Sequence, residues 1–138
     1  MSTKSLSELS DTIRKIDIAI LSTHTENGEI ASRPMSNNGE VEYDGDSYYF
    51  TDEASRVATD IEQNGMVSLG FQRDKSFFIC VQGRAELIRD KAEFEARWHA
   101  HLDRWFPNGV DTDGLVLIKV QATRITYWDG EEEGEVRL

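Results

Sequence analysis

The feature that most constrains the fold is a regular alternation of apolar and polar side chains from Ser76 to Ile88. Successive side chains of a strand point to opposite faces, so this pattern predicts a long strand with one face in a core. The apolar face would carry Phe77, Ile79, Val81, Ala85 and Leu87, with Gly83 among them. Cys80 and Gln82 would lie on the other face. A second long alternation, from Leu115 to Trp128, predicts a matching strand.

Shorter strand patterns, separated by turn residues, fill much of the remaining sequence. They cover residues 18–21, the stretch around 31–36, residues 41–43 paired with 47–51, and residues 66–72. Asn27-Gly28 is a strong hairpin turn, and hairpins join antiparallel strands. Regular βαβ units are absent from the pattern, which disfavours a parallel doubly wound sheet. We therefore expect six or seven mostly antiparallel strands that close into a small barrel.

Three helical patterns interrupt these strands. They cover residues 5–16, the segment between Asp52 and Gly65, and residues 90 to about 104. Ser5 with Glu8 forms a capping-box pattern at the start of the first helix, and Asp52 is the expected N-cap of the second. All of these elements fit one domain over residues 1–138, because a chain of this length can bury a sizeable core.

The charge and the cysteine content narrow the class of protein. The 15 Lys and Arg and the 26 Asp and Glu give a formal net charge of −11, which repels nucleic acid and anionic membranes. We therefore expect neither as a partner. The single cysteine excludes a disulfide within the chain and fits a reducing compartment. The N-terminus shows no apolar signal segment, so we predict a cytoplasmic protein.

Two segments are candidates for a binding site. Proline is confined to edges, ends and bulges of sheets, so Arg33-Pro34-Met35 predicts a strand with a ligand beside it. Arg33 would present its guanidinium to a phosphate or a ring carbonyl, and the alternative is a surface arginine at a bulge. In the second segment, Thr51 to Arg56, Ser55 and Arg56 open a helix whose first N–H groups favour a phosphate. The alternative there is an ordinary capped helix.

Other residue types give weaker signals. Trp105 and Trp128 each follow a long element beside a turn, a position that suits a planar ligand as well as a core or an interface. His99 and His101 have the wrong spacing for one helical face, and no acid or cysteine completes a set with them, so we predict no metal. The dinucleotide and P-loop glycine motifs do not occur.

Three groups of residues form a recognisable set when taken together. They are Ser32-Arg33-Pro34-Met35, Tyr49-Phe50-Thr51 with Ser55-Arg56, and Leu117-Ile118-Lys119-Val120 with Arg124 and Tyr127-Trp128-Asp129-Gly130. In this order and spacing they resemble the general stress protein 26 group of the FMN-binding split-barrel superfamily, which is related to pyridoxamine 5'-phosphate oxidase. The resemblance implies a mainly β (α+β) fold, a six-stranded antiparallel split β-barrel with flanking helices. It also implies a homodimer with FMN, or alternatively FAD, in the groove between the subunits.

The resemblance assigns a cofactor role to a defined set of residues. They are Arg33, Pro34 and Met35 along the flavin ring and ribityl chain, Phe50 and Thr51 beside it, Ser55 and Arg56 at the phosphate, Gln82 at a flavin carbonyl, and Trp105 and Trp128 of the neighbouring subunit beside the ring. The related group often has lysine at the position of Arg56, which conserves the positive charge but not the geometry.

Three hypotheses for the function stay open at this point. The first is a flavin-dependent oxidoreductase or flavin reductase of unknown substrate, in which the flavin carries the redox chemistry. The second is a flavin carrier or stress-response protein without turnover, because no general acid or base is assignable beside the predicted ring. The third is a cofactor-free dimer whose arginines make ion pairs. The acidic ending, Asp129 to Glu135, would repel a second phosphate, so we predict no oxidation of pyridoxamine phosphate.

Overall fold

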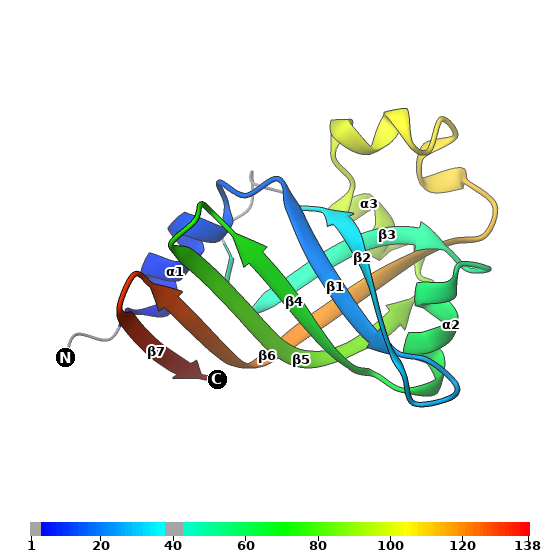
Figure 1. Cartoon of the computed structure of the whole chain (residues 1–138). Helices are drawn as coiled ribbons and strands as arrows, with labels where there is room; N and C mark the ends of the chain where they lie inside the picture. Colours follow the sequence, from blue (N-terminus) through cyan, green and yellow to red (C-terminus); the bar gives the residue numbers. More distant parts are fainter. Residues whose placement is uncertain (1–3, 38–42) are drawn as a thin grey trace.

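Seven strands and three α-helices are present in the computed structural model, which describes residues 4–37 and 43–138 (Figure 1). The α-helices are α1 (Leu6–Ile13), α2 (Arg56–Gln63) and α3 (Lys91–Arg97), and 3₁₀ helices follow at Ala100–Arg104 and Gly109–Asp111. The strands are β1 (Ile18–His24), β2 (Ile30–Ser36), β3 (Asp46–Asp52), β4 (Met66–Gln72), β5 (Phe77–Ile88), β6 (Leu115–Asp129) and β7 (Glu132–Arg137). Residues 41 and 42, part of a predicted strand, lie outside the described residues.

The strands form one antiparallel sheet in the order β2-β1-β4-β5-β6-β3, and β7 pairs with β6 beside this path. β2 and β3 are the two ends of the path, and no pairing between described residues joins them. The sheet therefore stays open between these two edges. The prediction of six or seven mostly antiparallel strands is confirmed, because the described sheet has seven. This is one strand more than the resemblance implies, and the predicted closure into a barrel is not found, because the described sheet is open.

β7 is the strand that the sequence did not predict. Gly130 takes a positive φ of 63° in the turn after β6, and residues 132–137 then pair with residues 124–129. The exposed face of β7 carries Glu133 and Glu135, and among its side chains only Val136 packs against the main core. A strand with one apolar side chain has no alternation to detect, which is why its acidic composition concealed it.

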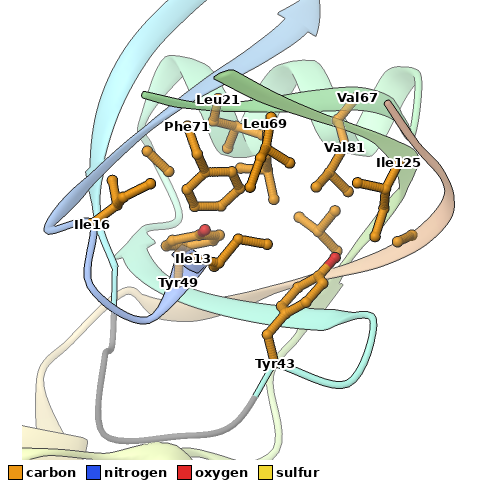
Figure 2. Close-up of a cluster of buried hydrophobic side chains, with 14 of the residues drawn as sticks. Ile13, Ile16, Leu21, Tyr43, Tyr49, Val67, Leu69, Phe71, Val81 and Ile125 are labelled. Atoms are coloured by element: carbon orange, nitrogen blue, oxygen red, sulfur yellow. The ribbon is translucent and has the colours of Figure 1, made fainter. Parts of the chain in front are cut away.

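The main core lies inside the curved sheet, and residues of α1 pack into it (Figure 2). The predicted inner face of β5 is confirmed, because Phe77, Ile79, Val81 and Ala85 are all buried. Tyr43 and Tyr49 direct their hydroxyl oxygens into this core (Figure 2), and burial raises the pKa of both phenols well above the ordinary value. The first helix begins with the predicted capping box of Ser5 and Glu8.

The N-cap of α2 differs from the prediction. The Ser55 hydroxyl accepts a hydrogen bond from the Ala58 backbone N–H at 3.2 Å, so Ser55 is the cap. The Asp52 carboxylate instead accepts from the Ala54 backbone N–H, in the turn before the helix. Both residue types suit a cap, and the length of that turn decides which one reaches the first free N–H groups.

The third predicted helix is also shorter than expected. It ends at Arg97, because Trp98 and His99 adopt extended backbone angles before the 3₁₀ helix begins. The Trp98 ring lies 5.0 Å from the Phe50 ring and 5.9 Å from the Phe106 ring, both edge to face. This aromatic packing on β3 accompanies the break that helical periodicity alone did not reveal.

Candidate functional site

The open edges of β2 and β3 border a pocket of about 300 Å³. Met35 and Ser36 of β2 line one part of the pocket, and residues 47–50 of β3 line another. Residues 96–99 and Leu102, from the end of α3 and the segment after it, complete the lining. Pro34 sits on β2 opposite Ile20 of β1, so the prediction that this proline marks an edge strand is confirmed. Met35 and Phe50, which were predicted to contact the same ligand, line this one pocket.

Aromatic side chains form the wall of the pocket above β3. The Phe50 ring lies 5.8 Å from the Phe94 ring in addition to its contact with Trp98. The Arg97 guanidinium lies 4.0 Å from the centre of the Tyr48 ring, which is a cation–π distance. Phe50 therefore lines the pocket, and its ring also contacts α3 and the residues that follow it.

The predicted phosphate residues meet where β3 leads into α2. The Thr51 hydroxyl donates to the Ser55 hydroxyl oxygen at 3.2 Å, and Ser55 caps the helix. Arg56 is the first residue of α2 and is exposed. Among the contacts of the described residues, Arg56 makes no ion pair and no side-chain hydrogen bond. A hydroxyl pair, a helix start and an unpaired guanidinium thus lie together.

Arg33 is held by three protein groups. One terminal nitrogen, Nη1, donates to the Leu21 carbonyl oxygen at 3.2 Å and to the Thr23 hydroxyl at 2.8 Å. The other, Nη2, lies 3.5 Å from Oδ2 of Asp60, a residue of α2 whose side chain is 1% exposed. The Thr23 hydroxyl donates to the same Asp60 oxygen at 2.8 Å. Neither a free surface arginine nor a bulge describes this position.

The electrostatic surroundings connect Arg33 with Arg56. Burial lowers the pKa of Arg33 from its ordinary value, the Asp60 carboxylate acts in the opposite direction, and the positive charge of Arg56 lowers it further. Two arginines therefore repel each other across the start of α2, in a chain whose formal net charge is −11. An anion bound between them would relieve that repulsion.

Four of the predicted residues do not join this group within one chain. Pro34 is exposed and is not among the residues that line the pocket. Gln82 lines a second pocket, of about 400 Å³, on the outer face of the sheet. The Trp128 indole N–H donates to Glu133 of β7 at 2.7 Å, and Trp105 is 67% exposed. None of the contacts among the described residues brings Gln82, Trp105 or Trp128 to Arg33 or Arg56, and Pro34 follows Arg33 with its own side chain exposed.

Thr23 and Asp60 are the site residues that sequence reasoning missed. α2 buries Val57, Ala58 and Ile61 as predicted, and Asp60 lies buried on the same side. A carboxylate on the apolar side of a short helix was the available signal, because buried carboxylates need a partner. Nothing in the sequence indicated that the partner would be Arg33.

Two absences complete the description of the site. Within residues 4–37 and 43–138, no three His, Cys, Asp or Glu side chains are grouped so that they could hold a metal ion. None of the helices in the same residues combines the length and the apolar character needed to cross a membrane. Cys80 is a free, half-buried thiol whose pKa is raised by burial and lowered less by Arg124, which is typical of an unreactive cysteine.

Comparison with solved structures shows the same fold in proteins with different ligands. A protein related to general stress protein 26 from Clostridium acetobutylicum, of the pyridoxinephosphate oxidase family, matches with a TM-score of 0.86 and 20% identity over 100% of this chain and 97% of that one. A general stress FMN/FAD binding protein from Xanthomonas citri matches with a TM-score of 0.76 and 20% identity over 92% and 89%. A heme binding protein from Mycobacterium smegmatis matches with a TM-score of 0.77 and 16% identity over 99% and 60%.

At these identities the structural matches show the fold alone. Comparison with curated proteins gives no match. A family model described as "Pyridoxamine 5'-phosphate oxidase like" matches residues 4–137, which is nearly the whole chain. The chain therefore belongs to the pyridoxamine 5'-phosphate oxidase-like family.

Proposed function

We propose that this protein binds FMN in the groove between β2 and β3, with the phosphate at the start of α2. The observation that carries the proposal is the pair of neighbouring arginines, Arg33 and Arg56, in a strongly acidic chain. Thr51 and Ser55 add hydroxyl groups, and the start of α2 adds free backbone N–H groups. FMN ends in a phosphate with about two negative charges, which this set of donors suits.

The other end of the groove suits the flavin ring. The pocket of about 300 Å³ beside Met35 and Phe50 is lined by aromatic and apolar side chains together with polar ones such as Ser47 and Arg97, a mixture that suits a flat organic ligand. The flavin ring would extend toward this pocket from the phosphate end. When bound, FMN would supply the electron-transfer chemistry, while the chain supplies position and charge.

We further propose that the protein is a cytoplasmic homodimer. Large apolar side chains are exposed on the outer face of four neighbouring strands, namely Ile18, Ile20, Met66, Phe78 and Trp128. Phe78 and Trp128 are directly paired, and Ile20 is paired with Pro34 and Gly70. Exposed apolar patches of this kind mark interaction surfaces. Gln82 and Trp128 lie on this face, so a second copy would be the means of bringing them to a flavin site.

The choice between an oxidoreductase and a flavin carrier depends on turnover. Among the described residues that line the pocket next to Met35 and Phe50 there is no carboxylic acid. The one histidine is His99, whose ring centroid lies 6.0 Å from that of His101. Oxidation of pyridoxamine phosphate is disfavoured, because β7 places Glu133 and Glu135 beside the C-terminal end of β6. We therefore propose an FMN-binding protein with an oxidoreductase activity toward another substrate, and a non-catalytic flavin carrier as the alternative.

Replacing Arg56 with alanine tests the proposed phosphate site. We expect the variant to bind FMN about 10-fold more weakly, the lower end of the effect of losing a hydrogen bond to a charged group. Riboflavin, which lacks the phosphate, should bind wild type and variant equally. Flavin fluorescence titration measures both affinities. Arg137→Ala, which removes another exposed arginine from β7, is the control and should bind FMN like the wild type.

The flavin that copurifies with the wild type decides between FMN and FAD when it is released and separated by chromatography. A wild-type protein that purifies colourless and binds neither FMN nor FAD would overturn the proposed function in favour of a cofactor-free dimer. Reduction of bound flavin by NADH or NADPH, followed by turnover with an electron acceptor, separates the oxidoreductase from the carrier.

Charge placed on the outer face of the sheet should break the proposed dimer. Ile20 is 44% exposed and belongs to this exposed apolar set, so Ile20→Glu would bury a carboxylate at the proposed interface. We expect the wild type to sediment as a dimer and the variant as a monomer of the same fold. Leu138→Glu, at another exposed apolar position, should stay dimeric. A wild type that sediments as a monomer at micromolar concentration contradicts the proposal.

A further inference from the structure

Some N–H groups of the Arg33 guanidinium donate hydrogen bonds to the protein, and others have no protein acceptor among the described residues. An arginine carries five N–H groups in one plane. The two on Nη1 donate to Leu21 and Thr23, and one on Nη2 faces Asp60. No acceptor among the described residues is bonded to Nε. The remaining donors are therefore Nε–H and the second N–H of Nη2.

The arrangement of the partners shows which side of the guanidinium is occupied. The Thr23 hydroxyl and the Asp60 carboxylate are hydrogen-bonded to each other at 2.8 Å, so both lie at the end of the guanidinium, where Nη1 and Nη2 meet them together. The two free N–H groups then lie parallel along the other side, as a fork that matches two oxygens of a phosphate. The Arg33 side chain is 21% exposed, so this fork can reach a ligand.

We propose that Thr23 and Asp60 are positioning residues that turn the free fork of Arg33 toward the phosphate of the bound flavin. This inference rests on the proposed function and adds to it how the phosphate is recognised. Two N–H groups of Arg33 would donate to the terminal phosphate, while Thr23 and Asp60 hold the guanidinium in place through its other N–H groups. Asp60 belongs to the same helix that begins with Ser55 and Arg56. The carboxylate thus also ties the start of α2 to β2, so that both arginines keep one spacing.

The burial of this cluster supports fixed geometry rather than a loose ion pair. Thr23 and Asp60 are each 1% exposed, and Oδ1 of Asp60 is buried with no partner among the described residues. A buried carboxylate with one oxygen unpaired is costly to the fold. The cost is explained if the other oxygen sets the direction of a functional guanidinium, since groups at binding sites must be held within narrow limits.

Two conservative variants test the proposal. Asp60→Asn keeps the shape and removes the charge, and Thr23→Val keeps the shape and removes the bridging hydroxyl. We expect each to weaken FMN binding about 10-fold or more, the size of the loss for a hydrogen bond to a charged group, and to leave riboflavin binding unchanged. Glu62→Gln is the matched control, because Glu62 lies on the same helix but pairs with Arg89 at the surface. It should bind both flavins like the wild type.

A double variant separates positioning from a general effect on the fold. Arg33→Lys keeps the charge but has no fork, so Asp60→Asn should weaken FMN binding much less in that background than in the wild type. Equal losses for FMN and riboflavin, or FMN affinities of both conservative variants within twofold of the wild type, would overturn the inference while the flavin site stands. If Asp60→Asn does not fold, Thr23→Val decides. A wild type that binds no flavin removes the proposed function and this inference together.

Discussion

Arg33→Ala should destabilise the folded protein by about 3–5 kcal/mol, the range for removing one partner of a buried ion pair. The reason is that the Asp60 carboxyl group, 1% exposed, would be left buried with only the Thr23 hydroxyl as a hydrogen-bond partner. The Leu21 carbonyl oxygen and the Thr23 hydroxyl would lose a donor as well. Urea unfolding followed by circular dichroism measures the change, as a lower midpoint with a similar slope.

Two further variants make this expectation specific. Arg56→Ala removes the same type of side chain from an exposed position, and we expect its unfolding midpoint to stay within error of the wild type. Arg33→Met combined with Asp60→Leu replaces the pair with apolar side chains, which is often close to neutral for buried pairs, so it should recover most of the lost stability. An Arg33→Ala protein as stable as the wild type would show that Asp60 finds another partner. For this reason flavin binding to Arg33→Ala alone is a poor test of the ligand site.

Gly83→Ala is the second large effect that we expect. Gly83 sits at a break in the register between β5 and β6, where Gln82 pairs with Arg124 and Gly83 with Ala122. A Cβ atom added there would lie 2.3 Å from the Gln121 carbonyl oxygen and 3.1 Å from the Ala122 Cα. Both neighbours are backbone in the centre of the sheet, so the strands would have to separate. We expect a loss of about 3 kcal/mol, the upper part of the usual range for overpacking.

Gly70 provides the matched control for this substitution. It lies in the neighbouring strand β4, and an added Cβ atom would have its nearest neighbours at 3.9 Å, an ordinary van der Waals distance. Gly70→Ala should therefore change the free energy of unfolding by less than about 1 kcal/mol, the size of the ordinary Gly-to-Ala effect on backbone entropy. Equal unfolding midpoints for the two variants would mean that the bulge shifts to accept a side chain. The same urea titration measures both.

The sequence determined the elements whose patterns are long and regular. The inner face of β5 and the apolar face of β6 follow from strict alternation, and the structure buries them as expected. Pro34 located an edge strand because proline cannot donate to a ladder, and β2 is an edge. Ser5 with Glu8 located the start of α1. In each case a local rule of backbone chemistry acts without knowledge of distant residues.

The sequence was less informative where short-range rules compete. The order of strands that leaves β2 and β3 unpaired depends on pairing across the whole chain, which no local pattern encodes. β7 was not predicted because its acidic side chains face solvent. The third helix was predicted too long because Trp98, which ends it, packs against the distant residue Phe50. Asp52 and Ser55 are equivalent as caps in sequence, and only the path of the turn separates them.

Arg33 shows the same division at the candidate site. Because Arg33 precedes a proline, the sequence alone predicts an arginine at a sheet edge. Its positive charge predicts that it binds negatively charged groups there. Only the tertiary structure decided that one of these partners is Asp60, 27 positions along the chain, and that two N–H groups remain for a ligand. The physical reason is that the N–H groups of Arg33 bind acceptors on β1 and α2, which come together only when these elements pack against β2. The spacing of these residues in the sequence does not predict that contact.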